Sequence, residues 1–286
     1  MGVAWLWTLI ALGGAVCACA AGDVERPEIV QALNRLYNFD FPSSHSLLRE
    51  SAANHPNDPM PHALDASVFL MGELDRLGIL AAEFFQDDRR LKDKRKVSPD
   101  PRIRDGILAA AERSERLAHA ALAAHPNDVN ALFALCLASG IRMDYTALIE
   151  KKLFKSYGYA KRAHEYASRV LRIDPDFYDV YLTVGFSEYL VGSLPFFVRW
   201  LGRMEFEGIQ GSKEAGRQRL VLAAERGRYM GPFAQILLSL FYLREKRLGE
   251  SREVLRDFLK EHPENPLVRR ELARLEERIQ TQSPSP

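Results

Sequence analysis

The stretch ILLSLFYLREKRLGESREVLRDFLKEHP (236–263) decides the fold class. In its second half, Val254, Leu255, Phe258 and Leu259 recur at the spacing of one helix face, with Arg, Glu, Asp and Lys between them. A proline then stops the helix, because proline cannot donate the next backbone hydrogen bond. An apolar stripe with a charged back is typical of a helix that packs against a neighbouring helix. The stretch therefore predicts helices packed in pairs.

The same pattern recurs upstream. The ranges 107–122 and 160–171 each show a one-sided apolar stripe. Four proline turns follow amphipathic helices, at 55–58 (HPND), 125–128 (HPND), 174–176 (DPD) and 262–265 (HPEN). Proline ends one helix, and Asn or Asp can cap the next, so we expect the three His of these turns to be turn residues, not metal ligands. No Asn-Gly or Asp-Gly hairpin occurs, and no alternating β-branched run persists, so the chain is predicted to be all-α.

Paired helices with late prolines resemble the tetratricopeptide repeat (TPR), a helix–turn–helix unit of about 34 residues with small and aromatic residues at fixed places. Counting back from the proline of 262–265 puts suitable residues at those places: Leu238, Ser239, Tyr242, Ser251, Leu255 and Phe258. Gly185 falls where two helices approach closely. The range 190–227 is similar to exported bacterial TPR proteins. The resemblance implies a right-handed solenoid of antiparallel helix pairs over residues 21–280, and it carries over no site.

The repeats are degenerate. Successive prolines of the four turns are 70, 49 and 88 residues apart, and none of these spacings is a multiple of 34. We therefore expect insertions near 80–104, 140–156 and 192–214. The last helix, predicted at 266–279, has a wide polar face that suits a terminal cap, and 281–286 is predicted to be a disordered tail.

The N-terminus indicates export. Residues 2–22 contain no charged side chain, and Ala18-Cys19-Ala20 has the small-x-small form of a cleavage site. A cleaved signal peptide over 1–20 is favoured, and an uncleaved membrane anchor is the alternative. Val16-Cys17-Ala18-Cys19 also resembles a bacterial lipobox, which would place lipidation on Cys19. The predicted location is the periplasm or a membrane anchorage in the cell envelope.

Composition narrows the function classes. The chain has 286 residues, and its 39 basic side chains nearly balance its 38 acidic ones, which argues against nucleic-acid binding. Cys136, the one cysteine beyond the N-terminal segment, is expected in the core. No Gly-x-Ser-x-Gly elbow, zinc-ligand spacing or phosphate loop occurs, so no catalytic, cofactor or metal residue is predicted. An enzyme whose site is built from the insertions is the alternative.

Three further segments have structural interpretations. The charge run at 86–105 is expected to be a solvated loop. Residues 208–216 are expected to be a glycine-rich connector before a helix, although their amides could hold an anion. The apolar segment 194–201 (LPFFVRWL) is expected to pack as core or lid, with ligand or membrane contact as alternatives.

The TPR resemblance implies a concave surface lined by the first helix of each pair. The candidate contact residues on it are Asn130, Phe133, Asp179, Leu182, Phe186, Tyr189, Phe233, Ile236, Leu240 and Arg244. Aromatic anchors beside a few polar groups suit an extended peptide or a helix. The leading hypothesis is therefore a non-enzymatic scaffold for a protein or peptide partner in the cell envelope. The alternative is a periplasmic carrier of a small molecule or lipid, which a closed apolar cavity beneath residues 196–201 would favour.

Overall fold

The structure is a computed structural model that describes residues 26–80, 98–193, 209 and 211–282. These residues form eleven α-helices, a π-helical turn η1 (Tyr145–Ile149) and a 3-10 turn η2 (Tyr178–Val180), with no strand among them. The α-helices are α1 (Pro27–Tyr37), α2 (Phe41–Asn54), α3 (Met60–Arg76), α6 (Pro101–Ala124), α7 (Val129–Asp144), α8 (Leu153–Ile173), α9 (Tyr181–Ser193), α11 (Lys213–Arg226), α12 (Gly231–Arg244), α13 (Leu248–Glu261) and α14 (Pro266–Gln282). The all-α prediction is confirmed.

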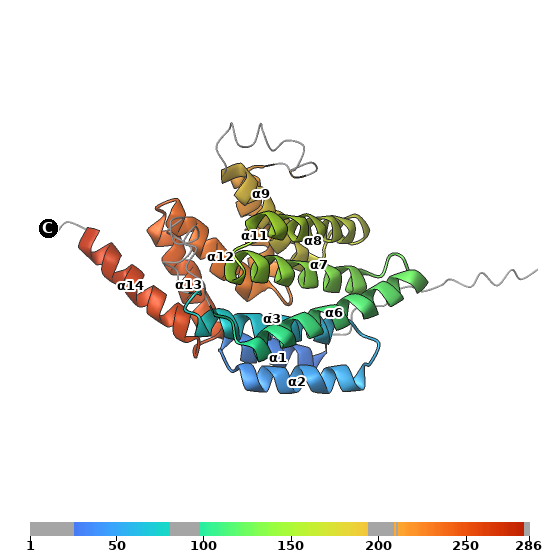
Figure 1. The fold of residues 1–286 in the computed structure, drawn as a ribbon. Helices are drawn as coiled ribbons and strands as arrows, with labels where there is room; N and C mark the ends of the chain where they lie inside the picture. The colour runs from blue at the N-terminus through green and yellow to red at the C-terminus, as the bar shows by residue number, and fades with distance from the viewer. Residues whose placement is uncertain (1–25, 81–97, 194–208, 210, 283–286) are drawn as a thin grey trace, which may run out of the picture.

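The helices pack mostly in sequential pairs, as the apolar stripes predicted. The pairs are α1 with α2, α3 with α6, α7 with α8, α9 with α11, and α12 with α13. In Figure 1 the first three pairs lie one above another, from α1–α2 through α3–α6 to α7–α8. Each proline turn follows the second helix of a pair. One amphipathic pair cannot bury its whole apolar surface, so each pair packs on the next.

The proline turns stop and start helices through specific groups. His55 and His125 are the C-cap residues of α2 and α6, which confirms them as turn residues. Asp128 caps α7 by accepting a hydrogen bond from Ala131 N at 2.9 Å, and Asn265 caps α14 by accepting one from Val268 N at 2.8 Å. These caps satisfy N–H groups that have no partner inside the helix.

A glycine pair lets α9 and α11 cross at close range. A Cβ on Gly185 would lie 2.7 Å from Gly216 O, and a Cβ on Gly216 would lie 2.5 Å from Gly185 O. The expected close approach at Gly185 is thus confirmed. The glycine motif 208–216 was expected to lead into a helix, and α11 begins within it at Lys213, so that Gly216 lies inside the helix.

The residues near 140–156, where an insertion was expected, are largely helical. The chain stays helical there: α7 runs to Asp144, η1 follows directly, and α8 begins at Leu153. The segment Val129–Ile149 is long and apolar enough to cross a membrane by length and composition, but most of it is buried inside the molecule. It packs against α3, α6 and α8, so its all-round apolar character is that of a central core helix.

The other predicted boundaries fall partly outside the described residues. This holds for the signal segment 1–20 with Cys19, for most of the insertions near 80–104 and 192–214, and for 194–201. The C-terminal helix α14 reaches Gln282, so residues 281 and 282 are helical and do not belong to a tail. Helix ends are the least certain part of a sequence-based assignment, because terminal turns fray.

The end of the first helix meets the start of the last one. Asn265 Nδ2, at the start of α14, donates a hydrogen bond to Tyr37 O at 2.7 Å, at the end of α1. The Tyr37 hydroxyl in turn donates to Tyr229 O at 2.8 Å, just before α12. Leu267 of α14 packs in a buried cluster with residues of α3 and α6. The helices therefore turn back on themselves around a common centre.

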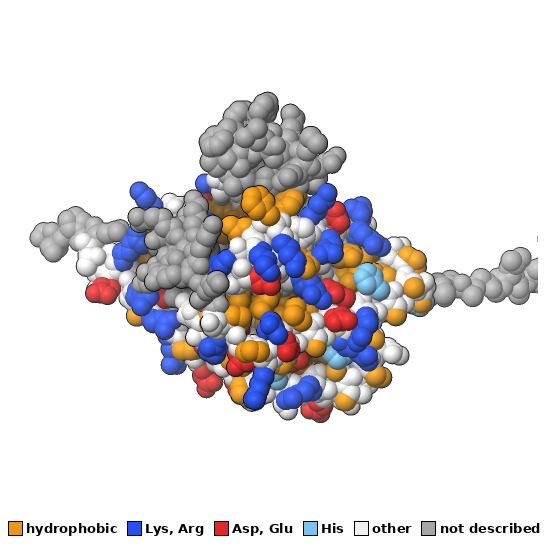
Figure 2. All heavy atoms as spheres, viewed as in Figure 1, with side chains coloured by type: hydrophobic (Ala, Val, Ile, Leu, Met, Phe, Trp, Pro, Cys, Tyr) orange, Lys and Arg blue, Asp and Glu red, His pale blue; other side chains and the backbone are white. Residues whose placement is uncertain are grey.

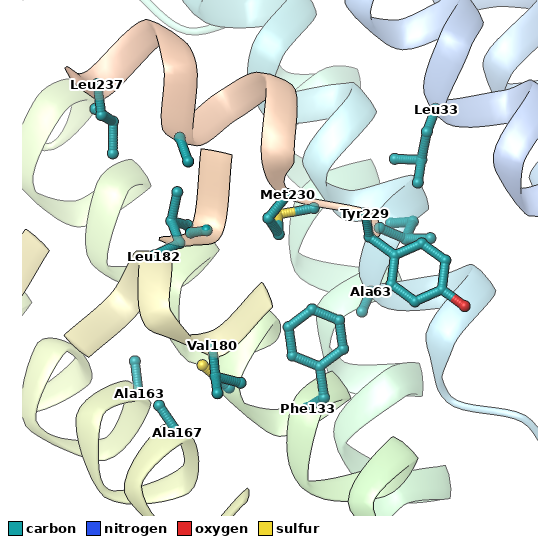
Figure 3. Packing of buried hydrophobic residues seen from close by; sticks show 14 of the residues in the cluster. Leu33, Ala63, Phe133, Ala163, Ala167, Val180, Leu182, Tyr229, Met230 and Leu237 are labelled. Atoms are coloured by element: carbon teal, nitrogen blue, oxygen red, sulfur yellow. The ribbon is translucent and has the colours of Figure 1, made fainter. Parts of the chain in front are cut away.

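Aromatic packing fixes the turn before α12. Figure 3 shows Phe133 of α7 beside Tyr229 and Met230, and the Phe133 and Tyr229 rings are stacked with centroids 6.2 Å apart. Asp179 holds the same turn, because its Oδ1 accepts hydrogen bonds from Tyr229 N and Met230 N, each at 2.7 Å. Two otherwise unpaired buried N–H groups are thereby satisfied.

Candidate functional site: a central apolar cavity

A cavity of about 220 Å³ lies at the centre of the helices. The first helices of four pairs, α3, α7, α9 and α12, supply most of its wall, and α1, α8, α13 and α14 contribute the other helical residues. The wall is predominantly apolar. Figure 2 shows hydrophobic side chains in the middle of the face viewed, with charged side chains around them.

Half of the candidate contact residues converge on this cavity. Leu182 and Phe186 reach it from α9, and Phe233, Ile236 and Leu240 reach it from α12. Their spacings of three and four residues place them on one face of each helix. Phe186, Phe233 and Ile236 are only partly buried, so large apolar surface remains available inside the cavity. Partner or ligand contact at these residues stays a prediction.

Three of the other candidates are buried and make internal contacts. Asp179 serves as the acceptor for the turn before α12, and Phe133 packs beneath that turn. Tyr189 stacks on Phe241 with ring centroids 3.6 Å apart, and its hydroxyl donates to Glu245 at 3.1 Å. Their surfaces are occupied by the fold itself. They therefore support the wall of the cavity without lining it.

The last two candidates lie away from the cavity. Asn130 Nδ2 donates to Asp58 Oδ1 at 2.8 Å, which ties the start of α7 to the turn before α3. Arg244 is the basic residue in the last turn of α12, where it is partly buried. Neither residue is part of the cavity wall.

The sequence interpretation missed several wall residues. Partly buried apolar side chains enter the cavity from segments other than those counted: Phe39, Met71, Leu137, Met143 and Leu148. Asp144 was missed as well, because 140–156 was interpreted as an insertion. A signal was present, since Asp144 is the one acidic residue in the apolar segment 129–149.

Two carboxyl groups belong to the described wall, Asp144 and Glu271. Burial in apolar surroundings raises the pKa of Asp144 to about 7. Glu271 lies 3.2 Å from the Arg274 guanidinium and 3.7 Å from that of Arg270, so its charge is compensated. Burial also raises the pKa of the Cys136 thiol to about 11, which makes it a weak nucleophile at neutral pH.

The wall presents mainly apolar surface, as small-molecule binding sites do. The cavity offers apolar surface and an isolated carboxyl group, whereas acid–base catalysis needs groups positioned together around a reacting atom. Within the described ranges, no three His, Cys, Asp or Glu side chains gather as metal ligands would. Neither a protein-family model nor a curated protein matches this sequence.

Proposed function

We propose that this chain is a non-enzymatic helical-repeat binding protein of the TPR type, exported to the cell envelope, that holds a small apolar molecule in its central cavity. The observation that carries the proposal is the convergence of apolar side chains from eight of the described α-helices on one cavity of about 220 Å³. A cavity walled by apolar groups is the usual form of a small-molecule site.

The proposed helical-repeat architecture is supported by the pairing of helices that are neighbours in sequence and by two glycines where helices cross. Helices pack mostly with sequence neighbours, and Gly185 and Gly216 allow the close crossing of α9 and α11. The first helices of the pairs face the cavity, as the inner helices of a solenoid do. Export is supported by the uncharged segment 2–22.

The junction between α14 and α1 favours a small molecule over an extended peptide. An open concave groove lets a peptide leave at both ends, but here Asn265 and Tyr37 join the last and first parts of the wall. An apolar cavity of about 150 Å³ holds benzene, so 220 Å³ corresponds to a ligand of roughly ten non-hydrogen atoms. A compact arylalkyl compound of that size is therefore a suitable test ligand.

Gly140 offers a direct test. It lies in the cavity wall, and a Cβ added to it meets no atom within 4 Å. Gly140→Leu should therefore fill the cavity without disturbing the helices. The control is Gly158→Leu on α8, since Gly158 also has nothing within 4 Å of an added Cβ but lies outside the wall.

Isothermal titration with 4-phenyl-1-butanol provides the measurement. We expect binding to the wild type and to Gly158→Leu, and at least a roughly tenfold loss of affinity in Gly140→Leu. Equal binding by all three proteins, or no binding to the wild type, would refute a small-molecule site in this cavity.

A protein or peptide partner is a second candidate, favoured by an exposed apolar pair at the start of α8. Phe154 is 99% exposed and Leu153 is 58% exposed. Large apolar side chains left in water often mark contact surfaces. Recovery of a protein from envelope extracts by the wild type and Gly140→Leu, with loss in Phe154→Ser, would support this function. Equal recovery by Phe154→Ser would contradict it.

A further inference from the structure

Asp144 stands apart from the other polar groups of the cavity wall. The remaining described side chains there that carry oxygen or nitrogen have hydrogen-bond partners within the protein, or for Glu271 ion-pair partners: Tyr37, Ser67, Thr183, Ser187, Ser239 and Asn265. Asp144 has no hydrogen bond or ion pair within the described part of the chain. Among the described wall residues, Asp144 is therefore the carboxyl group that is free to accept hydrogen bonds from a ligand.

The backbone presents Asp144 at a break in helix geometry. It is the last residue of α7, and the π-helical turn η1 begins at the next residue. There Glu150 N donates to Tyr145 O at 3.1 Å, a five-residue step. The Asp144 side chain does not cap this turn. Single π-turns within helices are frequent at functional sites, because the wider turn reorients side chains.

The lack of a partner for this carboxyl group has an energetic meaning. An ionised carboxylate in apolar surroundings loses its solvation by water. Only an opposite charge or hydrogen bonds compensate for that cost in free energy. No Lys, Arg or His belongs to the described wall. Among the described residues, the wall therefore supplies no cation for Asp144, and a cationic ligand could do so.

On the basis of the proposed binding function, we propose that Asp144 anchors the ammonium group of a small lipophilic amine whose apolar body fills the cavity. The ammonium donates charge-assisted hydrogen bonds to the carboxylate, which are stronger than neutral ones. Phe186, Phe233 and Ile236 contact the apolar body. A carboxylic acid of the same shape is disfavoured, because its negative charge would face the carboxylate of Asp144.

Three probes of one shape test the anchor: 4-phenylbutylamine, 4-phenyl-1-butanol and 4-phenylbutyrate. Titration calorimetry at about pH 8.5 keeps Asp144 ionised and the amine protonated. We expect the wild type to bind the amine at least roughly tenfold more tightly than the alcohol, and the butyrate most weakly. In Asp144→Asn the amine and the alcohol should bind equally. Glu271→Gln, the matched control, should keep the amine preference.

The outcomes separate the two proposals. The binding function stands if the wild type binds the alcohol and Gly140→Leu does not. The role of Asp144 is nevertheless wrong if the wild type binds the amine no more tightly than the alcohol. It is also wrong if Asp144→Asn still binds the amine more tightly. If none of the probes binds the wild type, both proposals fail. Because Asp144→Asn removes a buried charge, we expect it to fold, and binding of the alcohol by this variant verifies that.

Discussion

The crossing of α9 and α11 predicts that adding one methyl group at Gly216 destabilises the protein. In Gly216→Ala the new Cβ would lie 2.5 Å from Gly185 O and 2.5 Å from Tyr189 N. Ordinary van der Waals contact of a Cβ begins at about 3.4 Å, so the helices must move apart by about 1 Å. Both opposing atoms belong to the backbone, which cannot rotate away as a side chain can.

The expected change in unfolding free energy is the difference between the cost of overpacking and the gain in helix propensity. Overpacking costs about 3 kcal/mol, the upper part of the usual range, because the contact is with backbone on a neighbouring helix. Replacing a helical glycine by alanine returns about 1 kcal/mol. We therefore expect Gly216→Ala to lose about 2 kcal/mol of unfolding free energy, which for a chain of this size lowers Tm by about 4–8 °C.

Gly158→Ala is the matched control. Gly158 lies within α8, and nothing lies within 4 Å of its added Cβ, so only the helix-propensity term applies. That variant should gain about 1 kcal/mol, with Tm higher by roughly 2–4 °C. Urea and thermal unfolding followed by far-ultraviolet circular dichroism measure both. If Gly216→Ala were as stable as the wild type, the close crossing of α9 and α11 would be refuted.

Three further predictions concern buried polar groups. Asp179→Ala should lose about 3 kcal/mol of unfolding free energy in urea, because two buried N–H groups lose their acceptor. Asp179→Asn should lose less, because its amide oxygen still accepts. Equal losses in the two variants would contradict the role of Asp179 as acceptor. Burial lowers the pKa of His262, so the unfolded chain takes up the proton first and stability falls as pH drops below about 6.5. The unfolding free energy of His262→Phe should fall less steeply than that of the wild type between about pH 7 and pH 5. An unchanged slope would contradict a lowered pKa of His262. The pKa of Asp144 is raised to about 7, so its contribution to stability is lost as pH rises through that value. Asp144→Asn should therefore exceed the wild type by on the order of 3 kcal/mol at about pH 9 and by much less near pH 4, and a gap independent of pH would overturn the burial argument.

Local signals made much of the fold predictable. The stripe around Phe258, the proline turns and the caps at Asp128 and Asn265 all act within a few residues of chain, so a sequence shows them directly. Gly185 was predictable as well, because a glycine within a helical pattern carries a cost in stability and usually has a packing reason.

The cavity was less predictable, because it depends on contacts between distant residues. The bond between Asn265 and Tyr37 spans 228 positions, and its existence depends on the summed rotation of every helix pair between them. Asp144 is the last residue of α7 and lies within the range 140–156 that was interpreted as an insertion, so the sequence did not mark it as a wall residue. Leu182 and Phe186 were placed correctly on the inner face, since helix periodicity alone determines which residues share a side.

The junction of α14 with α1 limits how this architecture can change over evolutionary time. An open stack of hairpins tolerates duplication or deletion of one unit, since each unit contacts only its neighbours. Here an added hairpin would separate Asn265 from Tyr37, and a deleted one would force them past each other. Homologues that keep this junction should therefore share a fixed number of hairpins and vary in length within their loops.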